Sequence, residues 1–220
     1  AFKNETDVAL GHVDPNTTIY YTIDDQAEKL YEQPFKLTDD SHLKFYATTR
    51  TGQRSPVLTT SFTKIDPDRS ITLLSEYANQ YNGGGQNALI DGFKGAKDFR
   101  TGAWQGFHDQ HLEAVIDLGT VKSINKVSGS FLKRHSEWIF LPKQFSVYTS
   151  VDGKKYQLLT TQKVAAPKSA EAAGVVKISA TKNAKARYVK VVATNTGVCP
   201  SWHAGNGGKA WLFCDEITVQ

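Results

Sequence analysis

The sequence predicts an all-β protein made of two successive β-sandwich domains. Apolar and polar residues alternate with period two in five segments, 18–23, 42–49, 113–118, 144–150 and 187–194. The pair Asp152-Gly153 follows one of them and indicates a hairpin turn. Residues 64–70, with Pro67 between two aspartates, are typical of a linker, and all four tryptophans follow it. We therefore expect domains at residues 1–65 and 69–220.

Helical periodicity is almost absent from the chain. Only residues 70–81 have a helix-like spacing of apolar residues, and this segment is short. In the first domain, residues 1–64 contain about five short strands. The tyrosines there, such as Tyr20 and Tyr21, are expected to form core contacts and cross-strand pairs, so the domain is interpreted as a structural spacer.

Composition excludes several classes of function. The chain has 220 residues, of which 40% are hydrophobic, enough for one or two domains with real cores. It contains no run of 18 apolar residues, so no transmembrane segment is expected. Residues 1–68 carry a net charge of −4 and residues 69–220 one of +8, but the lysines are mostly scattered. Without a basic stripe or a basic helix, no nucleic-acid partner is expected.

Antiparallel alternation of the strands gathers three loops at one end of the second domain. These loops span residues 103–111, 134–140 and 197–208. Together they contain aromatic and imidazole side chains, namely Trp104, Phe107, His108, His111, His135, Trp138, Trp202 and His203. Trp104 and Trp211 adjoin strands and are expected in the core. For Trp138 and Trp202, the turn-like sequence leaves both core and surface positions open.

The C-terminal stretch also contains residues that bind metals in other proteins. Cys199, His203 and Cys214 lack the paired spacing of zinc sites, and alternation turns Cys214 and Asp215 to opposite faces of a strand. A disulfide between Cys199 and Cys214 is left open. No catalytic motif is present, and the neighbours Asp215 and Glu216 cannot act as a glycosidase pair, because adjacent strand residues face opposite ways. The sequence thus predicts no catalytic residues in this fragment.

Several motifs in order carry a resemblance to known families. Residues 69–220 resemble the discoidin, or F5/8 type C, domain and specifically family 32 carbohydrate-binding modules. The segments concerned are 87–106, 112–119, 131–156, 186–193 and 210–217. The first domain is similar to the C-terminal domain of chitobiases and β-hexosaminidases, through residues 20–24, 31–35 and 52–55. The resemblance implies a small immunoglobulin-like β-sandwich followed by a discoidin-type jelly-roll β-sandwich.

This order of domains resembles the tail of bacterial family 20 glycoside hydrolases. The resemblance implies a non-catalytic C-terminal fragment of a β-N-acetylhexosaminidase, which is secreted, periplasmic or on the cell surface. The catalytic domain would precede it in the same chain, and its glycan partner would be of the galactose or N-acetylhexosamine type. Two alternatives remain: an architectural tail that packs on the catalytic barrel, and an adhesion or surface-binding discoidin module.

The resemblance and the clustered loops together give the expected site residues. Trp138 and Trp202 would stack on sugar rings, while Arg134, His135 and His203 would bind sugar hydroxyls. The resemblance also implies a structural calcium ion. Its matching ligands are Asp91 and Glu216, with Asp98 and Thr101 as further candidates, and oxygen ligands suit this hard cation.

Overall fold

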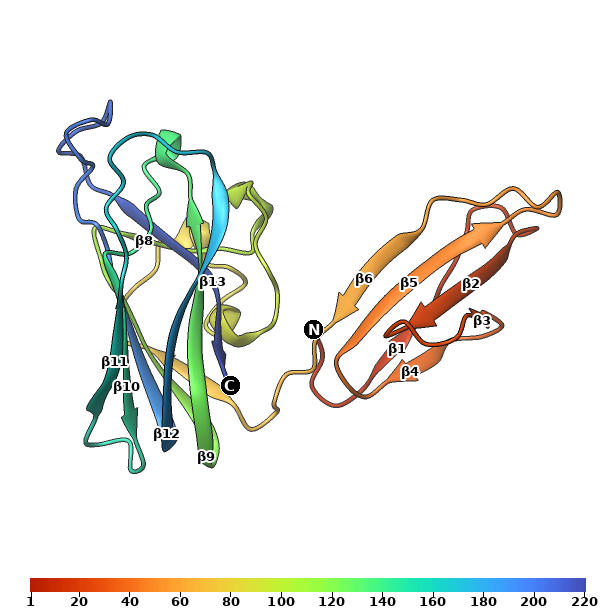
Figure 1. The fold of residues 1–220 in the computed structure, drawn as a ribbon, viewed down its shortest axis with the longest axis horizontal. Coiled ribbons are helices and arrows are strands. Elements are labelled where there is room, and N and C mark those ends of the chain that lie inside the picture. The colour runs from red at the N-terminus through yellow and green to blue at the C-terminus, as the bar shows by residue number, and fades with distance from the viewer. The chain divides into compact units, whose positions relative to one another are not determined.

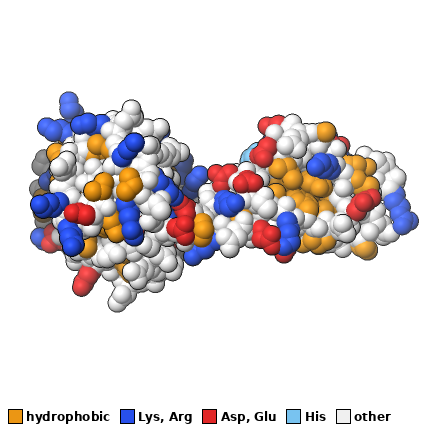
Figure 2. Space-filling view, turned by 90° about the horizontal axis from the view of Figure 1, so that it is seen from below, with side chains coloured by type: hydrophobic (Ala, Val, Ile, Leu, Met, Phe, Trp, Pro, Cys, Tyr) orange, Lys and Arg blue, Asp and Glu red, His pale blue; other side chains and the backbone are white.

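The computed structural model describes residues 1–220, which form two compact units, Ala1–Pro67 and Asp68–Gln220 (Figure 1). Both units consist of β-strands, and the only helices are four short 3-10 turns. None of these helices has the length and apolar character needed to cross a membrane. In the face of the second unit that Figure 2 shows, lysine and arginine side chains are separated by other side chains and form no continuous basic stripe.

The first unit contains two small antiparallel sheets. Its strands are β1 (Thr6–Val8), β2 (Thr18–Ile23), β3 (Lys29–Leu30), β4 (Phe35–Leu37), β5 (Ser41–Thr48) and β6 (Leu58–Phe62). One sheet has the order β3-β2-β5-β6, and β1 pairs with β4. Tyr21 stacks on Phe35 with ring centres 4.6 Å apart, and Tyr20 stacks on Tyr46, its partner across β2 and β5. The expected core and cross-strand roles of these tyrosines are confirmed.

The second unit is built on one seven-stranded sheet that folds over its own core. The elements are β7 (Ser70–Leu73), η1 (Asn79–Tyr81), η2 (Ala88–Ile90), η3 (Phe99–Thr101), β8 (Gln105–His108), β9 (Leu112–Lys133), η4 (His135–Glu137), β10 (Gln144–Ser150), β11 (Gln157–Lys163), β12 (Gly174–Thr194) and β13 (Trp211–Val219). The long strands β9 and β12 lie side by side and pair antiparallel along nearly their whole length (Figure 1).

The two halves of these long strands belong to two layers. Residues 114–117 of β9 also pair with β7, and the facing half of β12 pairs with β10. Residues 127–131 of β9 instead pair with β13, which pairs with β8. Phe131 from the second half meets Phe145 of β10 edge to face, with ring centres 5.9 Å apart. Contacts of this kind between the layers close the all-β sandwich that the sequence predicts.

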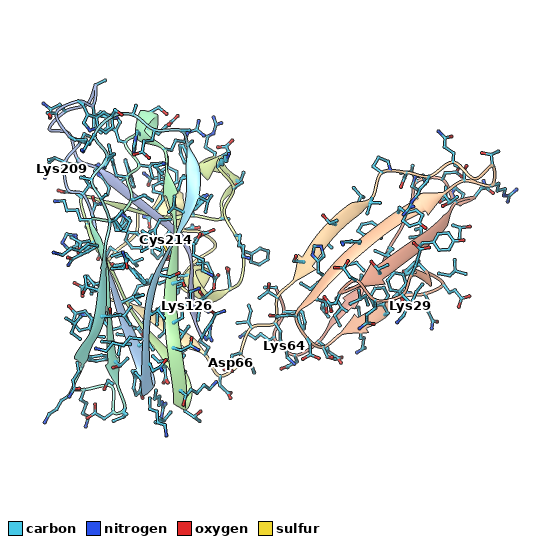
Figure 3. The ribbon with its side chains drawn as sticks, in the orientation of Figure 1. Lys29, Lys64, Asp66, Lys126, Lys209 and Cys214 are labelled. Atoms are coloured by element: carbon cyan, nitrogen blue, oxygen red, sulfur yellow. The ribbon has the colours of Figure 1, made fainter.

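The structure answers two questions that the sequence left open. Residues 70–81 do not form a helix: Ser70–Leu73 is strand β7, and only Asn79–Tyr81 forms a 3-10 turn. Ile71 is buried and pairs opposite Ile116, so pairing with β9 overrides the local spacing. Cys199 and Cys214 are both free thiols in separate core clusters, and Figure 3 shows Cys214 inside the second unit.

Candidate functional site

Three loops meet at one end of the second unit, as strand alternation predicts. The backbone N–H of Trp211 donates to the Trp138 carbonyl at 2.9 Å, which joins the 134–140 loop to the end of the 197–210 loop. Asp109 joins them through its backbone N–H to the Ala210 carbonyl, and its carboxylate pairs with Lys209 at 2.9 Å. In Figure 1, η4 and the 197–210 loop lie at the same end of the unit. We call this end the rim.

Trp138 is the tryptophan that the rim presents to solvent. It is 38% exposed, and its φ of +64° places it in the left-handed region. The other non-glycine residues with positive φ are aspartates, which adopt this conformation more readily than a bulky side chain does. The indole lies against Gly205 and Gly208, where an added Cβ would come within 2.5 Å and 2.4 Å of ring atoms. The indole thus packs closely against two glycines.

The two histidines of the predicted site are used inside the protein. Gly205 donates its N–H to Nδ1 of His203 at 2.9 Å, so the proton of this neutral ring is on Nε2, which donates to the His135 carbonyl at 2.6 Å. His135 is buried, accepts the N–H of Glu171 on Nδ1, and stacks on Phe140. Burial lowers the pKa of His135. These imidazoles join loops, whereas the sequence predicts that they bind sugar hydroxyls.

Trp202 and Arg134 are also held by protein partners. The indole N–H of Trp202 donates to the Pro167 carbonyl at 2.9 Å, and its ring packs beside Phe140. Arg134 pairs with Glu137 at 2.8 Å, donates to the Lys97 carbonyl and keeps about a quarter of its side chain exposed, at 27%. Of the five predicted residues, Trp138 and Arg134 are therefore the ones best placed to meet a ligand.

A polar hollow beside Arg134 was not predicted. It has a volume of about 230 Å³ and is lined by Gln80, Tyr81, Asn82, Phe99, Arg100, Gly102 and Trp104. The guanidinium of Arg134 lies 5.8 Å from the ring centre of Phe99, so the hollow adjoins the rim. Aromatic rings with amide and guanidinium groups around them are suited to binding polyols. The sequence feature that could have indicated this hollow is the run of Asn, Gln and Tyr residues at 79–82.

Asp91 and Glu216, the expected calcium ligands, are linked through one turn. Gly92 donates its N–H to Oε2 of Glu216 at 2.8 Å, and Phe93 donates to Oδ1 of Asp91 at 2.8 Å. Glu216 is only 7% exposed. Burial raises the pKa of Glu216 to about 8, and the nearby charge of Asp91 adds to the rise; burial also raises the pKa of Asp91. A buried carboxylate whose charge is disfavoured by a partly buried neighbouring carboxylate fits a cation between the two.

Asp98 and Thr101 do not share that environment. Both carboxylate oxygens of Asp98 accept from Arg100, at 2.8 and 2.9 Å, and these bonds lower the pKa of Asp98 to about 2. The Thr101 hydroxyl donates to the Asp98 carbonyl at 3.0 Å. No group of three or more His, Cys, Asp or Glu side chains is arranged to hold a metal ion. The fit to a cation therefore rests on Asp91 and Glu216.

Comparisons with known proteins identify the family. The family model of the F5/8 type C domain matches residues 70–216, and that of the Fn3 associated region matches residues 8–62. No curated protein matches this sequence.

Solved structures with some similarity include three carbohydrate-related modules. The module CpGH89CBM32-5 of Clostridium perfringens, in complex with GalNAc-β-1,3-galactose, is 19% identical over 69% of this chain and 94% of its own, with a TM-score of 0.43. The C-terminal domain of a chitobiase from Bacteroides fragilis is 21% identical over 70% and 93%, with a TM-score of 0.42. Chitosan-binding module 1 of a chitosanase/glucanase from Paenibacillus sp. IK-5 is 13% identical over 70% and 95%, with a TM-score of 0.43. The family model of the F5/8 type C domain covers more than half of the residues of the present chain, and the chain therefore belongs to the F5/8 type C domain family.

Proposed function

We propose that the second unit is a non-catalytic module that binds glycans of the galactose or N-acetylhexosamine type at the rim. The observation that carries this proposal is Trp138. A bulky residue in the left-handed region costs about 1–3 kcal/mol and persists only where its surroundings enforce it. Here the indole packs against Gly205 and Gly208 and stays partly exposed to solvent. An indole face suits the apolar C–H face of a pyranose.

Arg134 and the adjoining hollow supply the polar half of this proposed site. Arg134 pairs with Glu137, and the exposed Arg100 pairs with Asp98, so both guanidiniums have a carboxylate partner that orients them toward this region. Sugar hydroxyls exchange water for these donors, and each such hydrogen bond adds only about 0.5–1.5 kcal/mol. A single site should therefore bind weakly. Several modules or a repetitive glycan would strengthen the attachment by avidity.

The module's role in a larger protein is part of the same proposal. We propose that the first unit is a spacer and that the whole protein is a bacterial β-N-acetylhexosaminidase, secreted, periplasmic or on the cell surface, which the module holds near its glycan. Calcium, bound by Asp91 and Glu216, would be a structural cofactor. The architectural tail and the adhesion module remain the competing functions, and both predict that the isolated fragment binds no oligosaccharide of these types.

Replacing Trp138 by alanine tests the proposal directly. We expect Trp138→Ala to lower affinity for a galactosyl or N-acetylhexosaminyl oligosaccharide by about tenfold or more, because the aromatic plate and its contact area disappear. Titration calorimetry on the full chain would measure this. His108→Ala is the matched control, since His108 is exposed at the same end and stacks on Trp211 with ring centres 4.4 Å apart.

The affinity of the His108→Ala control should stay within about twofold of that of the unsubstituted chain, and both variants should show a cooperative melting transition. Trp202→Ala is less informative than the sequence suggests, because it removes an anchor of the 164–173 loop. Unchanged affinity in Trp138→Ala would remove the indole from the site and leave the hollow at Arg100 as the candidate. If no glycan binds the unsubstituted chain, the competing functions are favoured.

A further inference from the structure

An apolar cavity lies at the same end of the second unit, apart from Trp138 and the polar hollow. Its volume is about 100 Å³. The apolar walls come mainly from residues 140–142 and 164–167 and from Pro200. Lys133, His135, Lys143, Glu171 and Thr196 complete the lining. None of these residues contributes to the proposed cation site.

The outer wall of this cavity is a loop fastened at several points. Residues 164–173 connect β11 to β12 and contain no regular structure. Trp202 donates its indole N–H to the Pro167 carbonyl at 2.9 Å, and the N–H of Glu171 donates to Nδ1 of His135 at 3.2 Å. The Glu171 carboxylate also pairs with Lys133 at 2.5 Å. Three anchors make the loop a formed wall, so the cavity exists before a ligand enters.

The polar groups of the lining include both donors and acceptors. The Thr196 hydroxyl donates to the Leu141 carbonyl at 3.2 Å, which leaves its oxygen able to accept. The Lys143 side chain is exposed and forms no ion pair, so its ammonium can donate. The Glu171 side chain is 46% exposed and offers further acceptor positions. A ligand group that suits this lining has an apolar end, an acceptor and a donor.

The size of the cavity excludes a whole sugar ring. An apolar cavity of about 150 Å³ admits a benzene ring, and this one is smaller. A pyranose would in addition have to leave its hydroxyls unpaired against apolar walls, which is costly. Only a small substituent of a glycan can enter. An acetamido group has a methyl end, a carbonyl acceptor and an N–H donor, and it combines the three features that the lining requires.

We propose that this cavity is a subsite for the acetamido group of an N-acetylated sugar. The methyl group enters between the 140–142 and 164–167 walls, the carbonyl oxygen accepts from Lys143, and the amide N–H donates to Thr196 or Glu171. The inference rests on the proposed glycan-binding function and narrows it, because galactose and glucose carry no group that fills the cavity. His135 and Trp202 act here as positioning residues of the wall.

The test compares sugars with and without the acetyl group on the full chain. We expect N-acetylglucosamine and N-acetylgalactosamine to bind about tenfold tighter than glucose and galactose, which corresponds to one buried methyl group and one hydrogen bond. Their binding should shift the NMR resonances of Val164, Ala166 and Thr196. Ala166→Leu should remove the preference, because Ala166 lines the cavity and a larger side chain occupies it. Ala172→Leu is the matched control in the same exposed loop, outside the lining, and should keep the preference.

The outcomes separate this inference from the function on which it rests. Equal binding of acetylated and unacetylated sugars would overturn the acetamido subsite and leave the glycan-binding module standing. So would a preference that survives Ala166→Leu. If no sugar binds in any form, both proposals fail. A preference that persists in Trp138→Ala supports the cavity even if the indole proves unimportant.

Discussion

Removing calcium should destabilise the chain more at pH 8.5 than at pH 5. The proposed ligands explain the direction. Without a cation, Glu216 has a pKa of about 8 in the folded protein, against an ordinary value of 4.5. Between these values the folded state keeps a proton that the unfolded chain has released. Stability therefore falls as the pH rises through this window, by up to about 1.4 kcal/mol per pH unit for this carboxyl.

Neighbouring groups modify this slope in known directions. Burial raises the pKa values of Asp91 and Asp215 as well, which makes the alkaline loss of stability larger. His135 acts oppositely, because burial lowers its pKa, and stability is lost as the pH falls below its ordinary value of 6.5. A bound cation pairs with the ionised forms of Asp91 and Glu216 and should cancel the alkaline loss.

The measurement is the melting temperature of the full chain from pH 4.5 to 8.5, with calcium and with a chelator. Glu216→Gln separates this carboxyl from the other titrating groups, since it keeps the size of the side chain without its charge. With chelator present, Glu216→Gln should reduce the fall of the melting temperature with rising pH. It should also abolish most of the rise in melting temperature that calcium causes. If chelation leaves the melting temperature unchanged at every pH, Asp91 and Glu216 are only turn and strand residues.

The architecture was predictable because burial on one face of a strand leaves a period-two pattern. In β9, Leu112, Ala114 and Ile116 are buried while the residues between them are partly exposed. The same alternation gave the direction of each strand and so the end at which the loops meet. The helix-like spacing of residues 70–81 does not mark a helix, because β7 is only four residues long, too short for periodicity to separate strand from helix.

The roles of individual rim residues could not be predicted in the same way. His203 and His135 are of a residue type that often binds sugar hydroxyls. Their acceptor nitrogens, however, already accept the backbone N–H groups of Gly205 and Glu171. Such pairing depends on how two loops distant in sequence are placed, which no local pattern reports. The sequence also left Trp138 and Trp202 equivalent. The structure distinguishes them through Gly205 and Gly208, which lie beneath the first indole alone.

The adjacent Asp215 and Glu216 show a similar limit. Alternation predicted opposite faces for them, and the sequence offered no reason to bury both. In the structure the turn that follows Asp91 meets both carboxylates: Gly92 donates to Glu216 and Gly95 donates to Asp215 at 2.6 Å. The loop of residues 91–103 therefore packs on this part of β13, and its backbone donates one hydrogen bond to each acid, while Oδ1 of Asp215 stays buried without a partner. In the same loop Gly95 packs closely against Trp104, and substituting Gly95 tests how tightly the loop is packed.

Gly95→Ala should cost about 1–3 kcal/mol of unfolding free energy, the usual range for overpacking a filled core. An added Cβ would lie 2.1 Å from Cε2 of Trp104. The indole cannot move aside easily, because Trp104 is fully buried and its N–H donates to the Ala96 carbonyl at 2.9 Å. The backbone must shift instead, which strains the bond from Gly95 to Asp215.

Urea unfolding of the variant and of Gly174→Ala would measure this cost. Gly174 is the matched control, because a Cβ there meets nothing within 4 Å and its backbone needs no positive φ. The control should change stability by less than about 0.5 kcal/mol. Because the same short loop carries Gly92, which bonds Glu216, Gly95→Ala should also weaken calcium binding, whereas Gly174→Ala should not. Equal unfolding free energies for the two variants would show that the loop yields without cost and does not hold the proposed cation site in place.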